Sequence, residues 1–208
     1  MLFRSDLVYL PEVPFSVDKF LADIDRVRAE KGKCIVAVSE GVHDAEGNFI
    51  SELGSNLAKT KDAFGHSQMG GLAGTLANLV SEHTGAKVRG IELSLLQRCA
   101  AHCASGQDLE EAYEVGKQAV LAATSGETDK MMAIKRMEGE DYRYTIAAVP
   151  LSEAANAERT VPVEWMNEDH NEMTDEFVKY CLPLIQGPTL QKTENGLPRF
   201  AHLKKEHA

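Results

Sequence analysis

The sequence lacks the features that mark secreted, zinc-binding and membrane-spanning proteins. Its 208 residues include four cysteines and no Cys-x-x-Cys pair, which argues against a disulfide framework and against a zinc finger. Cys99, His102 and Cys103 lie close together, but no fourth ligand is evident, so we expect packed thiols and no metal. No apolar run approaches the roughly 20 residues of a membrane span, and the start MLFRSDLVYL has no signal-peptide cleavage site. These absences favour a cytoplasmic protein.

Positive charge is scarce as well. The chain has 22 lysines and arginines against 32 aspartates and glutamates, which gives a formal net charge of −10. Nucleic acids and anionic membranes are bound by basic surfaces, so we expect neither as a partner. An anionic ligand would have to be held locally by a few cations.

The first forty residues predict a strand, a helix and a second strand. The strand in DLVYL stops at Pro11 and Pro14, and Ser16 can cap a helix that Gly32 ends. The apolar residues of this helix recur at helical spacing, namely Val17, Phe20, Leu21, Ile24 and Val27. The apolar run CIVAVS at 34–39 is typical of a parallel strand that is covered on both faces.

Two stretches next to predicted elements of this core could bind a ligand. Glu40 and Gly41 come directly after the second strand, where ligands of open α/β sheets bind, so Glu40 could accept hydrogen bonds from hydroxyl groups. A helix cap or a solvated acid is the alternative. Further on, the glycine-rich stretch 59–71 precedes an apolar-faced helix and could bind phosphate through Lys61, His66, Gly70 and Gly71. An ordinary helix start with a structural histidine explains that stretch equally well.

The segment Lys87–Ser105 predicts a buried strand bracketed by Arg89 and Arg98. A buried guanidinium group needs a partner, because removing a charge from water without one is costly. Two arginines near one sheet suggest a phosphate ligand, which the planar guanidinium group can hold through paired hydrogen bonds. Two structural ion pairs are the alternative.

The second half of the chain predicts a helix, a hairpin and a short closing helix. Ser105 caps the first helix, for which we expect a buried face of Leu109, Ala112, Tyr113, Gly116, Ala119, Val120 and Ala123. MMAIKRM and YRYTIAAVPL then form antiparallel strands, and a helix capped near Thr174 follows. The chain is thus predicted to be an α/β domain over 1–187 with a small antiparallel appendix, and residues 188–208 a polar tail.

Seven segments together resemble the phosphofructokinase family. They are YLPEVPF (9–15), CIVAVSEG (34–41), KDAFGHSQMGG (61–71), KVRGIELSLLQRCAAHCAS (87–105), GETDKMMAIKR (126–136), VPLSEAAN (149–156) and VPVEWMNEDHNEMTDEFVKYCLPLIQG (161–187). Cys-Ala-Ala after Arg98 and Ala-Phe-Gly-His at 63–66 are similar to the pyrophosphate-dependent branch. The resemblance implies a three-layer α/β/α domain with a mainly parallel sheet.

The resemblance also implies roles for single residues. Arg89 and Arg98 should hold the 6-phosphate of fructose 6-phosphate, and Glu40 should contact the sugar. The family arginine that matches Arg89 acts across a subunit boundary, so a homo-oligomer is expected. Where ATP-dependent relatives carry a histidine, this chain has Leu95, which removes one phosphate donor.

The amino-terminal half of this family carries the phosphate-donor cradle, the general base and a Met-Gly-Arg segment for the sugar. Met69-Gly70-Gly71 does not match that segment. We therefore interpret the chain as the carboxy-terminal, acceptor-side part of a pyrophosphate-dependent 6-phosphofructokinase of glycolysis. It should contain no catalytic residue and should be inactive alone, and the Mg²⁺ expected for the complete enzyme should have no ligands in this chain.

Two alternatives stay open at this point. The chain could be the same part of an ATP-dependent 6-phosphofructokinase. It could also be a non-catalytic regulatory subunit that binds a sugar phosphate, since Glu40, Arg89 and Arg98 suit that function equally well.

Overall fold

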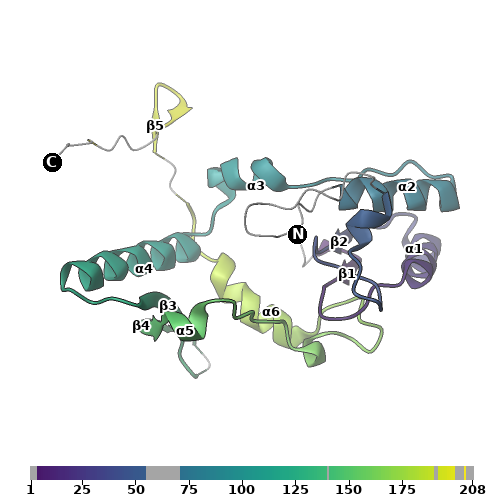
Figure 1. The fold of residues 1–208 in the computed structure, drawn as a ribbon. Helices are drawn as coiled ribbons and strands as arrows, with labels where there is room; N and C mark the ends of the chain where they lie inside the picture. The colour runs from purple at the N-terminus through teal and green to yellow at the C-terminus, as the bar shows by residue number, and fades with distance from the viewer. Residues whose placement is uncertain (1–3, 55–70, 140, 190–191, 200–203, 205–208) are drawn as a thin grey trace. The chain divides into compact units, whose positions relative to one another are not determined.

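The computed structural model describes residues 4–54, 71–139, 141–189, 192–199 and 204 (Figure 1). Contacts within the chain divide it into two compact units. Unit 1 comprises residues 1–93 and 159–179, and unit 2 comprises 94–158 and 180–208. The predicted division into a domain at 1–187 and a tail at 188–208 stays a prediction.

Unit 1 is built around a pair of parallel strands. Its elements are β1 (Leu7–Tyr9), α1 (Val17–Lys31), β2 (Val36–Val38), η2 (Ile50–Gly54), α2 (Leu72–Thr84), η4 (Val163–Trp165) and the start of α6 (Asp175–Cys181). In the register of the pair, Leu7 lies opposite Val36 and Tyr9 opposite Val38. The predicted strand, helix and parallel strand are therefore confirmed.

Helix α1 begins and ends where its capping residues predict. The Ser16 side chain accepts a hydrogen bond from the backbone N–H of Lys19, and Gly32 takes the left-handed conformation with φ of 71°. The helix buries Phe20, Ile24 and Val27, which are at most 3% exposed, against β1 and α2. Ser16 and Gly32 are local signals, and this is why the sequence alone located the helix so closely.

A buried polar cluster ties the segment 159–179 to this core. Asp23 of α1 accepts hydrogen bonds from the Tyr9 hydroxyl at 2.9 Å and from the Asn171 side-chain amide at 2.8 Å. The backbone N–H of Val8 donates to the carbonyl oxygen of Asn171 at 2.8 Å. Burial alone would raise the pKa of Asp23, but the hydrogen bonds from Asn171 and Tyr9 and the nearby Lys19 together lower it below its usual value. The cluster therefore stabilises the ionised carboxylate.

The strand predicted at Lys87–Ser105 is wrong. Residues 85–93 have no regular structure, and 94–99 form a short helix, α3 (Ser94–Cys99). The β-branched residues Val88 and Ile91 lie only at the start of the segment, whereas Leu-Leu-Gln-Arg at 95–98 consists of good helix formers. A strand also needs a hydrogen-bonded neighbour, and none lies beside this segment within the described residues.

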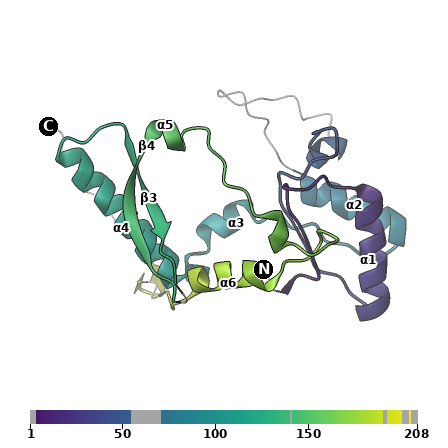
Figure 2. The ribbon, with the colours of Figure 1, turned by 90° about the horizontal axis from the view of Figure 1, so that it is seen from below.

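Unit 2 consists of a long helix along a two-stranded hairpin (Figure 2). Its elements are α3, η3 (Ala101–Cys103), α4 (Gly106–Thr124), β3 (Lys130–Arg136), β4 (Tyr144–Pro150), α5 (Leu151–Ala154), η5 (Leu182–Ile185), β5 (Thr193–Glu194) and β6 (Leu197–Pro198). The antiparallel pairing of β3 with β4 confirms the predicted hairpin. Ser105 caps α4 as expected, because its hydroxyl oxygen accepts from the backbone N–H of Asp108 at 3.2 Å.

The face of α4 that was predicted to be buried is exposed. Leu109, Tyr113 and Val120 are 49%, 69% and 63% exposed. Among the described residues of unit 2, only Glu111 is buried. Helical spacing finds the apolar face of a helix but not the element that covers it, and the described part of unit 2 supplies no cover for this face.

The α/β class and the antiparallel appendix are confirmed. In the described part of the chain the parallel sheet has two strands, and the hairpins β3–β4 and β5–β6 are antiparallel. Within the described residues, every helix is too short or too polar to span a lipid bilayer.

Candidate functional site

Glu40 lies at the carboxyl edge of the parallel strands, as predicted. The backbone N–H of Ser39 donates to the carbonyl oxygen of Tyr9 at 2.9 Å, so the pairing of β1 with β2 extends to the residue before Glu40. A Cβ added to Gly41 would lie 3.6 Å from the Cβ of Pro11, which places the two loops after these strands side by side. The Glu40 side chain is exposed at this edge, where it can accept hydrogen bonds from a ligand.

Arg89 is positioned by its two neighbours. Val88 packs against the core of unit 1. A Cβ added to Gly90 would lie 2.4 Å from the carbonyl oxygen of Ala73, so the chain crosses the first turn of α2 there at a distance that only glycine allows. Arg89 is exposed between these two anchor points. Gly90 was not among the predicted site residues, although its place directly after Arg89 was a signal in the sequence.

The glycine-rich stretch is described only at its end. Gly71 is the residue before α2 and has a φ of 84°, in the left-handed region that favours glycine. It therefore lies next to the turn of α2 that Gly90 crosses. The other predicted phosphate-binding residues, Lys61, His66 and Gly70, lie outside the described residues.

Arg98 belongs to the other unit. It lies in the last turn of α3 and is exposed. Both arginines were predicted to be buried in one strand, and that prediction is wrong for both. Within the described part of the chain neither arginine forms an ion pair, so nothing there supports the alternative of two structural ion pairs. The structure therefore does not bring Glu40, Arg89 and Arg98 together in one unit.

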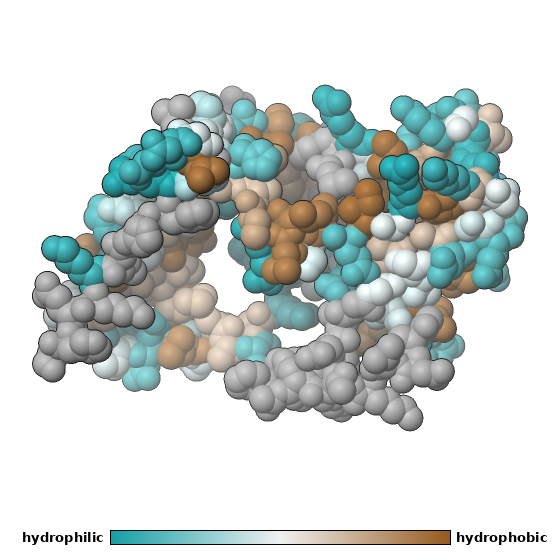
Figure 3. Space-filling view, turned by 90° about the horizontal axis from the view of Figure 1, so that it is seen from above, coloured by the Kyte–Doolittle hydropathy of each residue, from teal (hydrophilic) through white to brown (hydrophobic). Residues whose placement is uncertain are grey.

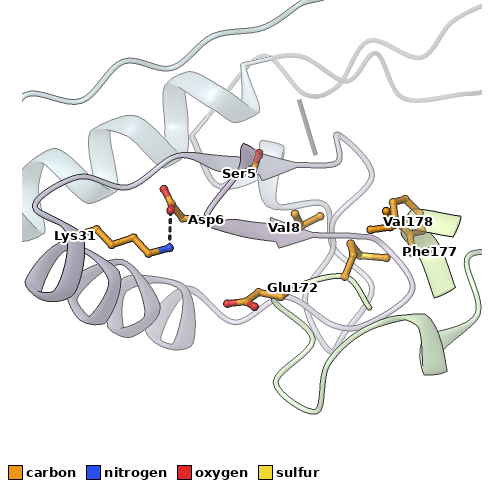
Figure 4. A pocket seen from close by; sticks show the side chains of 8 residues that line it. Ser5, Asp6, Val8, Lys31, Glu172, Phe177 and Val178 are labelled. Atoms are coloured by element: carbon orange, nitrogen blue, oxygen red, sulfur yellow. Dashed lines mark hydrogen bonds and ion pairs between the residues drawn. The ribbon is translucent and has the colours of Figure 1, made fainter. Parts of the chain in front are cut away.

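Among the described residues of unit 1, hollows lie at both ends of β1. The larger, about 380 Å³, is at the amino end of the strand, and its lining includes Asp6, Lys31 and Glu172 (Figure 4). The Lys31 ammonium group donates to Asp6 at 2.8 Å and, with the backbone N–H of Ile35, lowers the pKa of Asp6. A hollow of about 100 Å³ lies at the carboxyl end, well below the roughly 300 Å³ of small ligand sites. Neither hollow is lined by a predicted site residue.

The cysteines are only partly as predicted. Cys99 and Cys103 are exposed, so the expectation that they are packed is wrong for this pair. Cys34 is half-buried, and burial raises the pKa of its thiol to about 11. In the part of the chain that the structure describes, no three His, Cys, Asp or Glu side chains are grouped so that they could hold a metal ion.

Comparison with known proteins identifies the family. The family profile described as phosphofructokinase matches residues 1–122, which is more than half of the chain. The chain belongs to the phosphofructokinase family. The predicted resemblance to this family is thereby confirmed.

Two proteins match nearly all of this chain, whereas the chain covers less than half of each of them. The pyrophosphate–fructose 6-phosphate 1-phosphotransferase of Halomonas elongata is 39% identical over 199 residues, which are 96% of this chain and 46% of the relative. The crystal structure of a pyrophosphate-dependent phosphofructokinase from Marinobacter aquaeolei matches with a TM-score of 0.76 and 33% identity, over 97% of this chain and 45% of that one. These shares are consistent with the carboxy-terminal part of such a protein.

A more distant relative is named for a different phosphate donor. The ATP-dependent 6-phosphofructokinase 3 of Streptomyces coelicolor is 32% identical over 163 residues, which are 78% of this chain and 44% of that protein. The pyrophosphate-named relative is both more similar and matched over more of the chain.

Proposed function

We propose that this chain is the acceptor-side part of a phosphotransferase that moves a phosphoryl group from pyrophosphate to the 1-hydroxyl of fructose 6-phosphate. One observation carries the proposal. A relative named for this reaction matches 96% of the chain, whereas the chain covers 46% of that relative. The rest of the machinery would come from the part of the fold to which the chain does not align.

The acceptor-side function rests on Glu40, Arg89 and Arg98. Arginine suits the 6-phosphate because its planar guanidinium group donates paired, charge-assisted hydrogen bonds. Arg89 and Arg98 are exposed, and no described carboxylate pairs with either of them. Glu40, exposed at the carboxyl edge of β1 and β2, would accept hydrogen bonds from the sugar hydroxyls. We expect the two arginines to act on one phosphate, each contributed by a different copy of the chain in an assembled oligomer.

The donor side is expected outside this chain. Phosphoryl transfer requires the donor, Mg²⁺ and the acceptor hydroxyl to be held in line. The family resemblance assigns the donor cradle and the general base to the amino-terminal half, and Mg²⁺ would bind there with the pyrophosphate. This chain would then hold the sugar phosphate and turn nothing over alone.

ATP as the phosphate donor is the second candidate, because an ATP-dependent enzyme is among the relatives. Pyrophosphate is favoured by the higher identity of the Halomonas protein, 39% against 32%. It is also favoured by Cys-Ala-Ala after Arg98, which is similar to the pyrophosphate-dependent branch.

A coupled assay for fructose 1,6-bisphosphate tests the proposal. The purified chain is incubated with fructose 6-phosphate and Mg²⁺, with either pyrophosphate or ATP, and the Halomonas elongata relative serves as the active control. We expect no product above the blank with either donor. Product formation by the chain alone that follows enzyme concentration would overturn the proposal that the donor side lies elsewhere.

A further inference from the structure

Helix α4 packs with its apolar side outward. The side turned to the rest of unit 2 consists mainly of polar residues, namely Gln107, Glu111, Glu114, Val115, Gln118 and Ala122, which are buried or half-buried. The opposite side, which we call the outer face of α4, carries Leu109, Ala112, Tyr113, Gly116, Ala119, Val120 and Ala123, all exposed. A helix on the surface of a folded protein normally buries its apolar stripe, so this arrangement is reversed.

Specific contacts hold the helix in this orientation. The buried Glu111 carboxylate accepts a hydrogen bond from the Tyr142 hydroxyl, next to the hairpin, at 2.5 Å and another from the Gln107 side chain at 2.8 Å. At the start of α4, the Ser105 hydroxyl donates to the carbonyl oxygen of Leu184 at 2.6 Å. Because the polar side is bonded to the hairpin and to η5, the helix cannot turn its outer face inward without breaking these contacts.

Exposed apolar residues are concentrated in unit 2. Of the nineteen large apolar side chains exposed among the described residues, fourteen belong to unit 2 and five to unit 1. Apolar side chains are visible on the surface in Figure 3, among hydrophilic ones. Every buried apolar residue of the described chain belongs to unit 1. The described part of unit 2 therefore has an apolar surface but no buried apolar core, which is typical of one half of an interface.

We propose that the outer face of α4 is an assembly surface that binds the part of a phosphofructokinase to which this chain does not align. The relatives supply the size of this partner, since 54% of the Halomonas protein has no counterpart in the chain. Ala112, Gly116, Ala119 and Ala123 leave room for close approach of a flat apolar surface, such as one face of a β-sheet. The inference rests on the proposed function, because it identifies the partner as the donor side of the same enzyme.

A second copy of this chain fits the outer face less well. Asp108 and Glu110 flank it, and Lys117, the only basic residue of α4, is already paired with Glu114 at 3.1 Å. Two copies would bring these acidic flanks together, which disfavours self-association.

Co-purification tests the assembly surface. The part of the Halomonas elongata protein without a counterpart here is produced with an affinity tag in the same cells as the full 208-residue chain. We expect the tagged part to retain the chain, and the double variant Tyr113→Lys/Val120→Lys to reduce retention at least tenfold. Both positions are exposed, so the substitutions leave unit 2 folded, and circular dichroism checks this. The matched control is Ile35→Lys/Leu53→Lys, at exposed apolar positions of unit 1.

Three outcomes would overturn the proposal. They are no retention of the unchanged chain, equal loss of retention in both double variants, and a dimer of the chain alone that Tyr113→Lys/Val120→Lys dissociates in sedimentation velocity. Retention is measured without catalysis, so the two proposals fail separately. A complex that forms but does not phosphorylate fructose 6-phosphate would contradict only the proposed function.

Discussion

At the scale of single residues, Asp23 is the centre of the polar contacts in unit 1. Asp23 is 8% exposed. It joins α1 to β1 through Tyr9, and it joins α1 to the segment 159–179 through Asn171. Lys19 and Arg26 lie 3.3 and 3.5 Å from its carboxylate oxygens and compensate its charge. A buried carboxylate is stable only with such partners, so its removal should be felt throughout unit 1.

We expect Asp23→Asn to lower the free energy of unfolding by about 1–3 kcal/mol at pH 7, because charged hydrogen bonds are lost. The pKa of Asp23 is lower in the folded than in the unfolded protein. The stabilisation by its carboxylate is therefore fully present above the unfolded-state pKa near 4, and it disappears as the pH falls through the lower folded-state pKa. Urea unfolding at pH 7, 5 and 3 measures this, followed by the fluorescence of Trp165, the single tryptophan of the chain.

The difference in unfolding free energy between wild type and Asp23→Asn should therefore shrink at pH 3. Glu30→Gln, at an exposed position of the same helix, is the matched control and should change stability little at any of these pH values. An Asp23→Asn effect that stays constant from pH 7 to pH 3 would contradict the role of the ionised carboxylate.

Two glycine-to-alanine substitutions test how Arg89 is positioned. Gly90→Ala should destabilise unit 1 by about 1–3 kcal/mol, since its Cβ would meet the Ala73 carbonyl oxygen at 2.4 Å. Gly74→Ala is the control, because its Cβ meets nothing within 4 Å and alanine favours the helix by about 0.5–1 kcal/mol. The midpoint temperature of thermal unfolding should therefore fall in Gly90→Ala and rise in Gly74→Ala. If Gly90→Ala unfolds like the wild type, the close crossing over α2 is not present.

At the scale of elements, structure that depends on local signals was predictable and structure that depends on distant partners was not. Helix α1 has its cap residues and apolar spacing within its own sequence, and it was predicted from Ser16 to Gly32. The strand at Lys87–Ser105 failed because pairing depends on a neighbouring strand. The buried face of α4 failed for the same reason, since its polar side is bonded to Tyr142 from a distant loop.

The positions of the candidate site residues were likewise predictable only where they depend on local signals. Glu40 lies at the edge where it was predicted because it comes just after β2 (Val36–Val38), a strand that its own sequence predicts. The environment of Arg89 depends on Ala73, sixteen residues earlier, and Arg98 proved to belong to another unit. Apolar composition around the two arginines therefore predicted burial that tertiary structure does not provide.

The rates of amide hydrogen exchange should differ between the two long helices, α1 and α4. Amides of α1 between Phe20 and Val27 should exchange at least tenfold more slowly, after correction for intrinsic rates, than amides of α4 between Leu109 and Ala123. The reason is that α1 is covered by a buried apolar core and α4 is not. Mass spectrometry of exchanged peptides measures this. Equal protection of both helices in the chain alone would show that α4 already has a cover.

At the scale of the whole molecule, the two units differ as parts of one larger fold would. Unit 1 has a buried core, a parallel strand pair, and Glu40 and Arg89 at its surface. Unit 2 has Arg98 and an outward apolar helix face. Under the two proposals, the part of the relatives to which the chain does not align would cover the apolar face of α4, and the acceptor site would use the three exposed residues Glu40, Arg89 and Arg98.

The most direct test of the account is a calorimetric titration of the chain with fructose 6-phosphate, with fructose as the uncharged control. We predict binding of the phosphorylated sugar only. Arg89→Ala and Arg98→Ala should each weaken it roughly 10- to 100-fold, as the loss of a charged hydrogen bond implies. Lys87→Ala, an exposed cation beside Arg89, should leave it unchanged. Absence of binding, or binding that survives both arginine substitutions, would contradict the assignment of these residues to the acceptor site.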